Sequence, residues 1–137
     1  MKTLLKILLR DAMRSGAVSG AGRLDAATFK SIEVWIREKQ YLDSEDTMRD
    51  VAVKLGISVG QLAGYCRRVV GKPFLSWRKE LRIREACRLI EEEPDTPLYI
   101  IGELVGIKDK SNFRRQFTEV MKTSPAAWRR DREKRQG

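Results

Sequence analysis

Two stretches of the sequence decide the fold: MRDVAVKLGISVGQLAGYC, residues 48–66, and LYIIGELVGIKDKSNFRRQF, residues 98–117. They are two copies of one pattern of apolar and small residues. Up to the glycine and the isoleucine that follows it, matched positions lie fifty residues apart, as Gly56 and Gly106 do. One residue is then inserted, and the offset becomes fifty-one, so that Ser58 matches Asp109.

Each copy predicts a short helix, a glycine turn, a polar cap and a longer helix. Thr47 and Asp50 have the spacing of a capping box, and Gly56 is typical of a helix C-terminus. Ser58 and Asp109 are the expected N-caps of the longer helices, which span the ranges 59–70 and 110–121. Because the glycine connection is short, the two helices must cross steeply, which is the geometry of a helix-turn-helix.

The rest of the chain also predicts helices. Apolar residues at helical spacing run over residues 26–39, Pro73 suits the first turn of a long helix to Glu92, and Pro125 opens a last helix that enters a basic tail. No stretch alternates with period two for long enough to form a strand. The predicted fold class is all-α, with Trp35, Trp77 and Trp128 in the core.

The composition excludes several classes of function. The 137 residues include 28 Lys plus Arg, 19 Asp plus Glu, two Cys and no His, for a net charge of +9. Without His there is no Ser-His-Asp or Cys-His catalysis and no His-ligated metal. We therefore expect no catalytic residue, no metal site and no cofactor, and we interpret Cys66 and Cys87 as buried thiols in a reducing cytoplasm. The excess positive charge favours a polyanionic partner, and residues 58–137 carry +7 of it.

Residues 1–22 form a separate region. Lys2, Lys6, Arg10 and Arg14 make one basic stripe on a helix with an apolar stripe beside it, and residues 15–22 are a Gly/Ser-rich linker. This helix fits a dimerisation contact, a membrane surface, a juxtamembrane remnant or a packing role on its own domain. The predicted domains are residues 1–22, residues 23–93 with the first helix-turn-helix and the linking helix, and residues 94–137 with the second helix-turn-helix and the basic tail.

Residues 28–130 resemble the DNA-binding domain of the AraC/XylS family of bacterial transcriptional regulators. LRIREACRLI in the linking helix and SNFRRQF and TSPAAWR in the second copy carry the resemblance most clearly. It implies a homeodomain-like domain of seven helices, with two helix-turn-helix units joined by a long central helix. It further implies a protein that binds promoter DNA specifically and usually activates transcription through RNA polymerase. The expected location is the cytoplasm, with membrane anchoring as an alternative if the chain is a fragment of a larger one. Family members commonly carry a separate ligand-binding or dimerisation domain, so the chain is either a stand-alone regulator or the C-terminal part of a larger one. A homodimer would then form through the N-terminal helix or an upstream domain, and no small-molecule site is expected within these residues.

The second unit holds the stronger candidates for reading bases. Side chains in the first turns of a recognition helix face the major groove. Those turns carry Lys110, Ser111, Asn112, Arg114 and Arg115. Arginine can bind guanine, and asparagine adenine, with two hydrogen bonds each. Arg115 is the expected main reader, while Arg114 and Arg115 also fit phosphate contacts.

The first unit has fewer side chains that can contact bases than the second unit. Its groove-facing candidates are Gly60, Gln61 and Gly64, and the two glycines weaken the helix by about 1 kcal/mol each. Either this helix docks by close backbone approach, or it reads weakly through Gln61 and a thymine-methyl contact from Ala63. The expected phosphate contacts come from both units, at Arg67, Arg68, Lys72, Arg78, Lys108 and Lys122.

Two alternatives to a specific regulator stay open from the sequence alone. The weak first unit fits a nonspecific architectural DNA binder. The basic N-terminal helix fits an interaction protein that is recruited to a membrane or to a partner helix.

Overall fold

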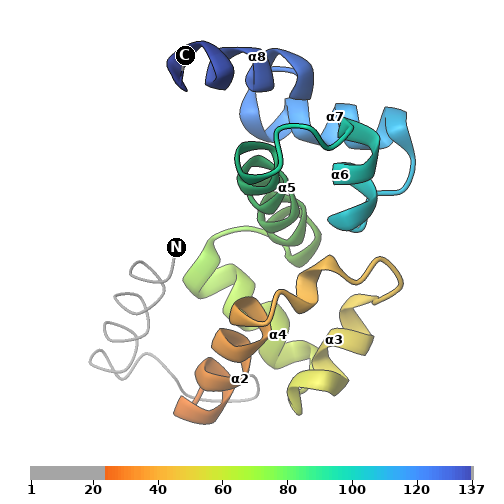
Figure 1. Ribbon diagram of the computed structural model, residues 1–137. Coiled ribbons are helices and arrows are strands. Elements are labelled where there is room, and N and C mark those ends of the chain that lie inside the picture. The colour runs from red at the N-terminus through yellow and green to blue at the C-terminus, as the bar shows by residue number, and fades with distance from the viewer. Residues whose placement is uncertain (1–23, 137) are drawn as a thin grey trace. The chain divides into compact units, whose positions relative to one another are not determined.

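The computed structural model describes residues 24–136, and its ordered elements there are all helical (Figure 1). It has seven α-helices and no strand in this range, which confirms the all-α fold class. A 3₁₀ turn, η1, and a π-helical turn, η2, complete the set of elements. In chain order they are α2 Ala26–Arg37, η1 Gln40–Leu42, α3 Met48–Leu55, α4 Val59–Tyr65, η2 Cys66–Val70, α5 Phe74–Glu92, α6 Leu98–Leu104, α7 Lys110–Met121 and α8 Pro125–Gln136. The predicted N-terminal helix and linker of residues 1–22 lie outside the described residues.

The described part of the chain divides into two compact units. Residues 24–40 and 45–77 make up the first unit, and residues 41–44 and 78–136 make up the second. The division falls inside α5, between Trp77 and Arg78. The assignment of separate functional domains to residues 23–93 and 94–137 stays a prediction. None of the described helices is long and apolar enough to cross a bilayer.

The first helix-turn-helix, α3 and α4, forms where its caps predict it. The Thr47 hydroxyl accepts a hydrogen bond from the Asp50 N–H at 3.1 Å, and the Asp50 carboxylate accepts one from the Thr47 N–H at 2.9 Å. This reciprocal pair is the predicted capping box, and it lowers the pKa of Asp50 through the two hydrogen bonds from Thr47. Gly56 then ends α3 with a φ of 71°, in the left-handed region that glycine adopts without strain.

Aromatic side chains fill the core of the first unit. Trp35 lies 5.5 Å from Trp77 and 6.1 Å from Phe74 between ring centroids, and Tyr65 lies 5.7 Å from Phe29 in an edge-to-face contact. Burial raises the pKa of Tyr65 well above its usual range. Tyr65 also lies 5.6 Å from Trp77 between ring centroids, so it packs α4 against both α2 and the start of α5.

The second helix-turn-helix, α6 and α7, packs more tightly around its glycines. A methyl group placed on Gly102 would lie 2.9 Å from the Phe113 ring, so glycine lets the two helices approach closely. The core beneath them contains nine buried residues from α5 to α8: Ile83, Ala86, Ile90, Ile101, Val105, Ile107, Phe113, Phe117 and Trp128. Trp35, Trp77 and Trp128 are all buried, as predicted.

A buried arginine attaches the segment that contains η1 to the second unit. Arg82 in α5 is 8% exposed, and its guanidinium donates to the carbonyl oxygens of Tyr41 and Asp43, both at 2.7 Å. These two hydrogen bonds to backbone carbonyls offset much of the free-energy cost of burying a charged guanidinium in a low-dielectric interior.

The two cysteines are free thiols, with Cys66 buried and Cys87 half-buried. Burial raises the pKa of each thiol to about 11, so both are almost fully protonated near neutral pH.

Candidate nucleic-acid interface

Helix α7 separates a core face from an exposed polar face. Asp109 caps it by accepting a hydrogen bond from the Asn112 N–H at 2.7 Å, as predicted. Phe113 and Phe117 are buried and contact each other edge to face, with ring centroids 5.9 Å apart. The predicted base readers of this helix lie on the other side: Lys110, Ser111, Arg114 and Arg115 are exposed, and Asn112 is half-buried.

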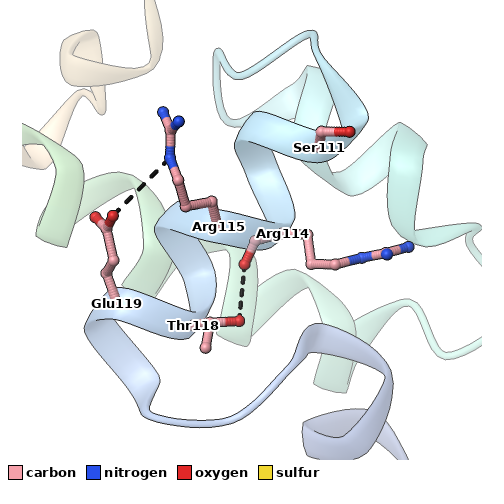
Figure 2. Close-up of a pocket in the computed structure, with 5 residues that line it drawn as sticks. All are labelled: Ser111, Arg114, Arg115, Thr118 and Glu119. Carbon is pink, nitrogen blue, oxygen red and sulfur yellow. Dashed lines mark hydrogen bonds and ion pairs between the residues drawn. The ribbon is translucent and has the colours of Figure 1, made fainter.

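A shallow, open hollow of about 450 Å³ runs along the exposed face of α7 (Figure 2). Its lining comes from one helix only: Ser111, Arg114, Arg115, Thr118 and Glu119. Figure 2 shows the side chains of Arg114 and Arg115 extending in different directions from the helix. This surface therefore offers two guanidinium groups to an anionic partner at two separate places.

Two neighbouring side chains hold the guanidinium of Arg115. Its Nη2 donates to Oδ1 of Asn112, and its Nε lies 3.9 Å from Oε1 of Glu119. Gln116 Nε2 donates to the same Asn112 oxygen at 3.2 Å. No described residue forms an ion pair with the guanidinium of Arg114. The two arginines of this helix thus differ: Arg115 has two side-chain partners, and Arg114 has no ion-pair partner among the described residues.

Glu119 also pairs with α5. Its Oε2 lies 2.9 Å from Nζ of Lys79, and this hydrogen bond is the main cause that lowers the pKa of Glu119. The sequence prediction missed both residues. The four-residue spacing of Arg115 and Glu119 was a usable signal for one pair, whereas Lys79 lies forty residues away in the sequence.

Lys110, at the start of α7, lies against an aromatic ring. Its Nζ is 4.7 Å from the ring centroid of Tyr99, a residue of α6 that is itself 46% exposed. A cation above a ring keeps its charge available to a second anionic partner on the open side. Tyr99 is therefore a further residue of this surface that the prediction did not include.

The first recognition helix, α4, exposes fewer polar side chains than α7 does. Gly60 is exposed, and a methyl group placed on it would meet only the Ser58 hydroxyl, at 3.7 Å. Gln61 belongs to a second capping box: its Oε1 accepts from the Ser58 N–H at 2.8 Å while its own N–H donates to the Ser58 hydroxyl at 3.0 Å. The Ser-x-x-Gln spacing carried that signal, which the prediction of a base contact overlooked.

Gly64 and Gln61, two predicted base-contacting residues of α4, are both engaged within their own unit. Gly64 is buried, between the core residues Leu62 and Tyr65 along α4. Because its atoms are covered by its own unit, burial counts against a base contact from Gly64, which stays a prediction. A bidentate base contact from Gln61 stays a prediction, and it requires the side chain to leave the capping box, since Oε1 is already engaged.

The predicted phosphate contacts are mostly at the surface. Arg67, Arg68, Lys72, Lys108 and Lys122 are exposed, and Arg78 is half-buried. Lys122 ends α7 with a φ of 61°, a left-handed conformation that is uncommon for a residue with a side chain. Among residues 24–136, no group of three or more Cys, Asp and Glu side chains is placed to hold a metal ion.

Comparison with known proteins gives a match over most of the chain. A family described as a helix-turn-helix domain matches residues 40–131. Arabinose operon regulatory proteins of Salmonella typhimurium and Escherichia coli are each 31% identical over 87 residues, which is 64% of this chain. The chain spans only about a third of their length, 31% and 30% respectively.

Two solved structures share the fold. The C-terminal domain of AraT, a response regulator from Geobacillus stearothermophilus, has a TM-score of 0.68 at 24% identity, covering 80% of this chain and 88% of that one. The C-terminal domain of the two-component response regulator yesN from Fusobacterium nucleatum has a TM-score of 0.63 at 28% identity, covering 73% and 95%.

Proposed function

The chain belongs to the AraC/XylS family through its DNA-binding domain, and from this premise we propose that it recognises specific promoter sequences through two recognition helices in the major groove. As a member of that family it is a DNA-binding transcription regulator and not an enzyme. One observation carries the proposal of specificity: the exposed face of α7 combines a capped N-terminus with an oriented arginine at position 115. Such a preorganised donor is suited to read a guanine edge.

The two helices contribute unequally in this proposal. Helix α7 supplies base contacts from Lys110, Ser111, Arg114 and Arg115, with Arg115 as the main reader. Helix α4 supplies an open backbone at Gly60, with Gln61 mainly in its capping role. The exposed Arg67 and Arg68 in η2 then anchor the first unit on phosphates.

Selection from random duplexes tests specific recognition. The full chain and Arg115→Ala are each taken through rounds of binding to random double-stranded DNA, and the enriched sequences are compared. We expect one enriched motif for the wild type that includes a guanine, and loss of that preference in Arg115→Ala. Enrichment of no motif by the wild type would contradict the proposal and favour a nonspecific architectural binder, a function that the bare surface of α4 also fits.

We propose further that the regulator works in the cytoplasm as a homodimer. We also propose that it activates transcription by contacting RNA polymerase. Support for activation comes from the family resemblance. In vitro transcription from a promoter with the selected motif checks it, with the same promoter carrying a scrambled motif as control. A motif-dependent rise in transcript is expected, and a motif-dependent fall would instead assign repression.

A further inference from the structure

Asn112 has no free acceptor with which to read an adenine. Recognition of adenine by asparagine requires the side-chain oxygen to accept from N6 while the side-chain nitrogen donates to N7. The Oδ1 atom of Asn112 already accepts from Arg115 Nη2 and from Gln116 Nε2. A carbonyl oxygen has two lone pairs, so both acceptor positions are filled.

The orientation of the Asn112 amide follows from chemistry. A guanidinium group carries only donors, so the atom of Asn112 that it contacts has to be the oxygen. The side chain is also half-buried, and its backbone N–H is held by the Asp109 cap at 2.7 Å. Asn112 is therefore fixed from both its backbone and its side chain, with its acceptor turned towards Arg115.

Arg115 keeps the edge that guanine needs. Asn112 takes one hydrogen of Nη2, and Glu119 lies beside Nε, at 3.9 Å from its Oε1. Both hydrogens of Nη1 and the second hydrogen of Nη2 have no partner among the described residues, and Figure 2 shows the guanidinium extending outward from α7. Two parallel donors on that edge match the O6 and N7 acceptors of guanine.

Glu119 is itself anchored. Its second oxygen is held by Lys79 from α5 at 2.9 Å, and this ammonium keeps the carboxylate ionised by lowering its pKa. A carboxylate fixed to a second helix is a better guide for a guanidinium than a freely rotating one, because less side-chain entropy is lost when the pair forms.

We propose that Asn112 and Glu119 are positioning residues for Arg115, so that α7 reads a guanine through Arg115 and makes no adenine contact through Asn112. This inference rests on the proposed function, since it concerns which bases the regulator reads. It replaces the expectation that Asn112 reads adenine with a role in orienting its neighbour.

Variants of Asn112 separate the two roles. Selection on the full chain is followed by titration of the best duplex and of duplexes changed at each motif position. Arg115→Ala should reduce the preference for the guanine by about tenfold or more. Asn112→Ala should reduce the preference at that same position by about three- to tenfold and leave every other position unchanged. Loss of an adenine preference at a different position in Asn112→Ala would overturn the proposal.

Asn112→Asp is the conservative rescue. Aspartate still accepts from Arg115 but cannot donate to adenine N7, and it suits the first turn of a helix. We expect weaker binding to every duplex, because a negative charge is added, with the guanine preference kept within about twofold of the wild type. If Asn112→Asp loses discrimination as fully as Asn112→Ala does, the positioning role is overturned.

Glu119→Gln provides a second, opposite signature, with Glu103→Gln as its matched control. Glu103 is exposed on α6 and takes part in no side-chain hydrogen bond or ion pair with the described residues. Both variants remove one negative charge and should bind all duplexes more tightly. Only Glu119→Gln should also weaken the guanine preference, by about two- to fivefold, and an unchanged preference would overturn the role of Glu119.

The outcomes also distinguish this inference from its premise. A wild type that enriches no motif would overturn the proposed function, and the inference with it. A wild type with a clear motif, whose guanine preference is the same in Asn112→Ala, would overturn the inference alone. Circular dichroism of each variant checks that the helices are retained.

Discussion

Lys122 occupies a backbone conformation that normally belongs to glycine. It ends α7 with a φ of 61°, whereas the matching residue of the first unit, Gly71, has a φ of 78°. A side chain in the left-handed region costs roughly 1–2 kcal/mol, part of which glycine gives back through its greater freedom in the unfolded chain. The strain at Lys122 is consistent with a functional role for its side chain, such as the proposed phosphate contact.

Replacing Lys122 by glycine should therefore stabilise the fold and weaken DNA binding together. We expect the free energy of unfolding to rise by about 0.5–1 kcal/mol. The slope of log K against log salt should become shallower (less negative) by about 0.9. Urea denaturation and DNA titrations at several salt concentrations measure the two effects. Gly71→Lys is the mirror control and should lose about 1 kcal/mol. A destabilised Lys122→Gly would show that the lysine side chain supports the fold.

At the scale of elements, the two helix-turn-helix turns use glycine for different reasons. Gly56 has a φ of 71°, and a methyl group placed on it would have no neighbouring atom within 4 Å. Gly106 has a φ of 85°, and a methyl group there would clash with the carbonyl oxygen of Leu42. The first turn requires only a conformation, while the second requires a conformation and space.

Alanine at each turn should separate these two requirements. Gly56→Ala should cost about 1 kcal/mol for the left-handed backbone. Gly106→Ala has the same conformational cost and must also displace the backbone at Leu42, which Arg82 holds in place through Tyr41 and Asp43. It should therefore cost more than about 3 kcal/mol. Chemical denaturation followed by circular dichroism compares them. Equal losses at the two sites would mean that the segment around Leu42 moves aside without penalty.

Elements were predictable from the sequence wherever their signals were local. Thr47 with Asp50, and Asp109 at the start of α7, form the predicted caps because each cap involves residues three positions apart. Contacts across long separations were not predictable: Arg82 reaches Tyr41 over 41 residues, and Lys79 reaches Glu119 over 40. Gln61 shows a different limit, because one side chain suits both a capping box and a base contact, and pattern alone does not rank them.

At the scale of the whole molecule, the structure shows where many of the cations behind the net charge of +9 lie. Base reading and phosphate binding lie on different residues in the proposed interface. Arg115 is held by its neighbours, whereas the phosphate candidates are mostly exposed cations in both units. Binding strength and sequence preference should therefore respond to different substitutions.

Salt dependence tests that separation on the whole molecule. If the six candidates Arg67, Arg68, Lys72, Arg78, Lys108 and Lys122 each neutralise a phosphate, the slope of log K against log salt should be about −5. Arg67→Ala should make it shallower by about 0.9 without changing the selected motif, and Arg115→Ala should change the motif more than the slope. Lys30→Ala, at an exposed position of α2 outside the proposed interface, is the control and should change neither. A wild-type slope shallower than about −2 would mean that most of these cations face solvent in the complex, because counterion release scales with the number of phosphates neutralised.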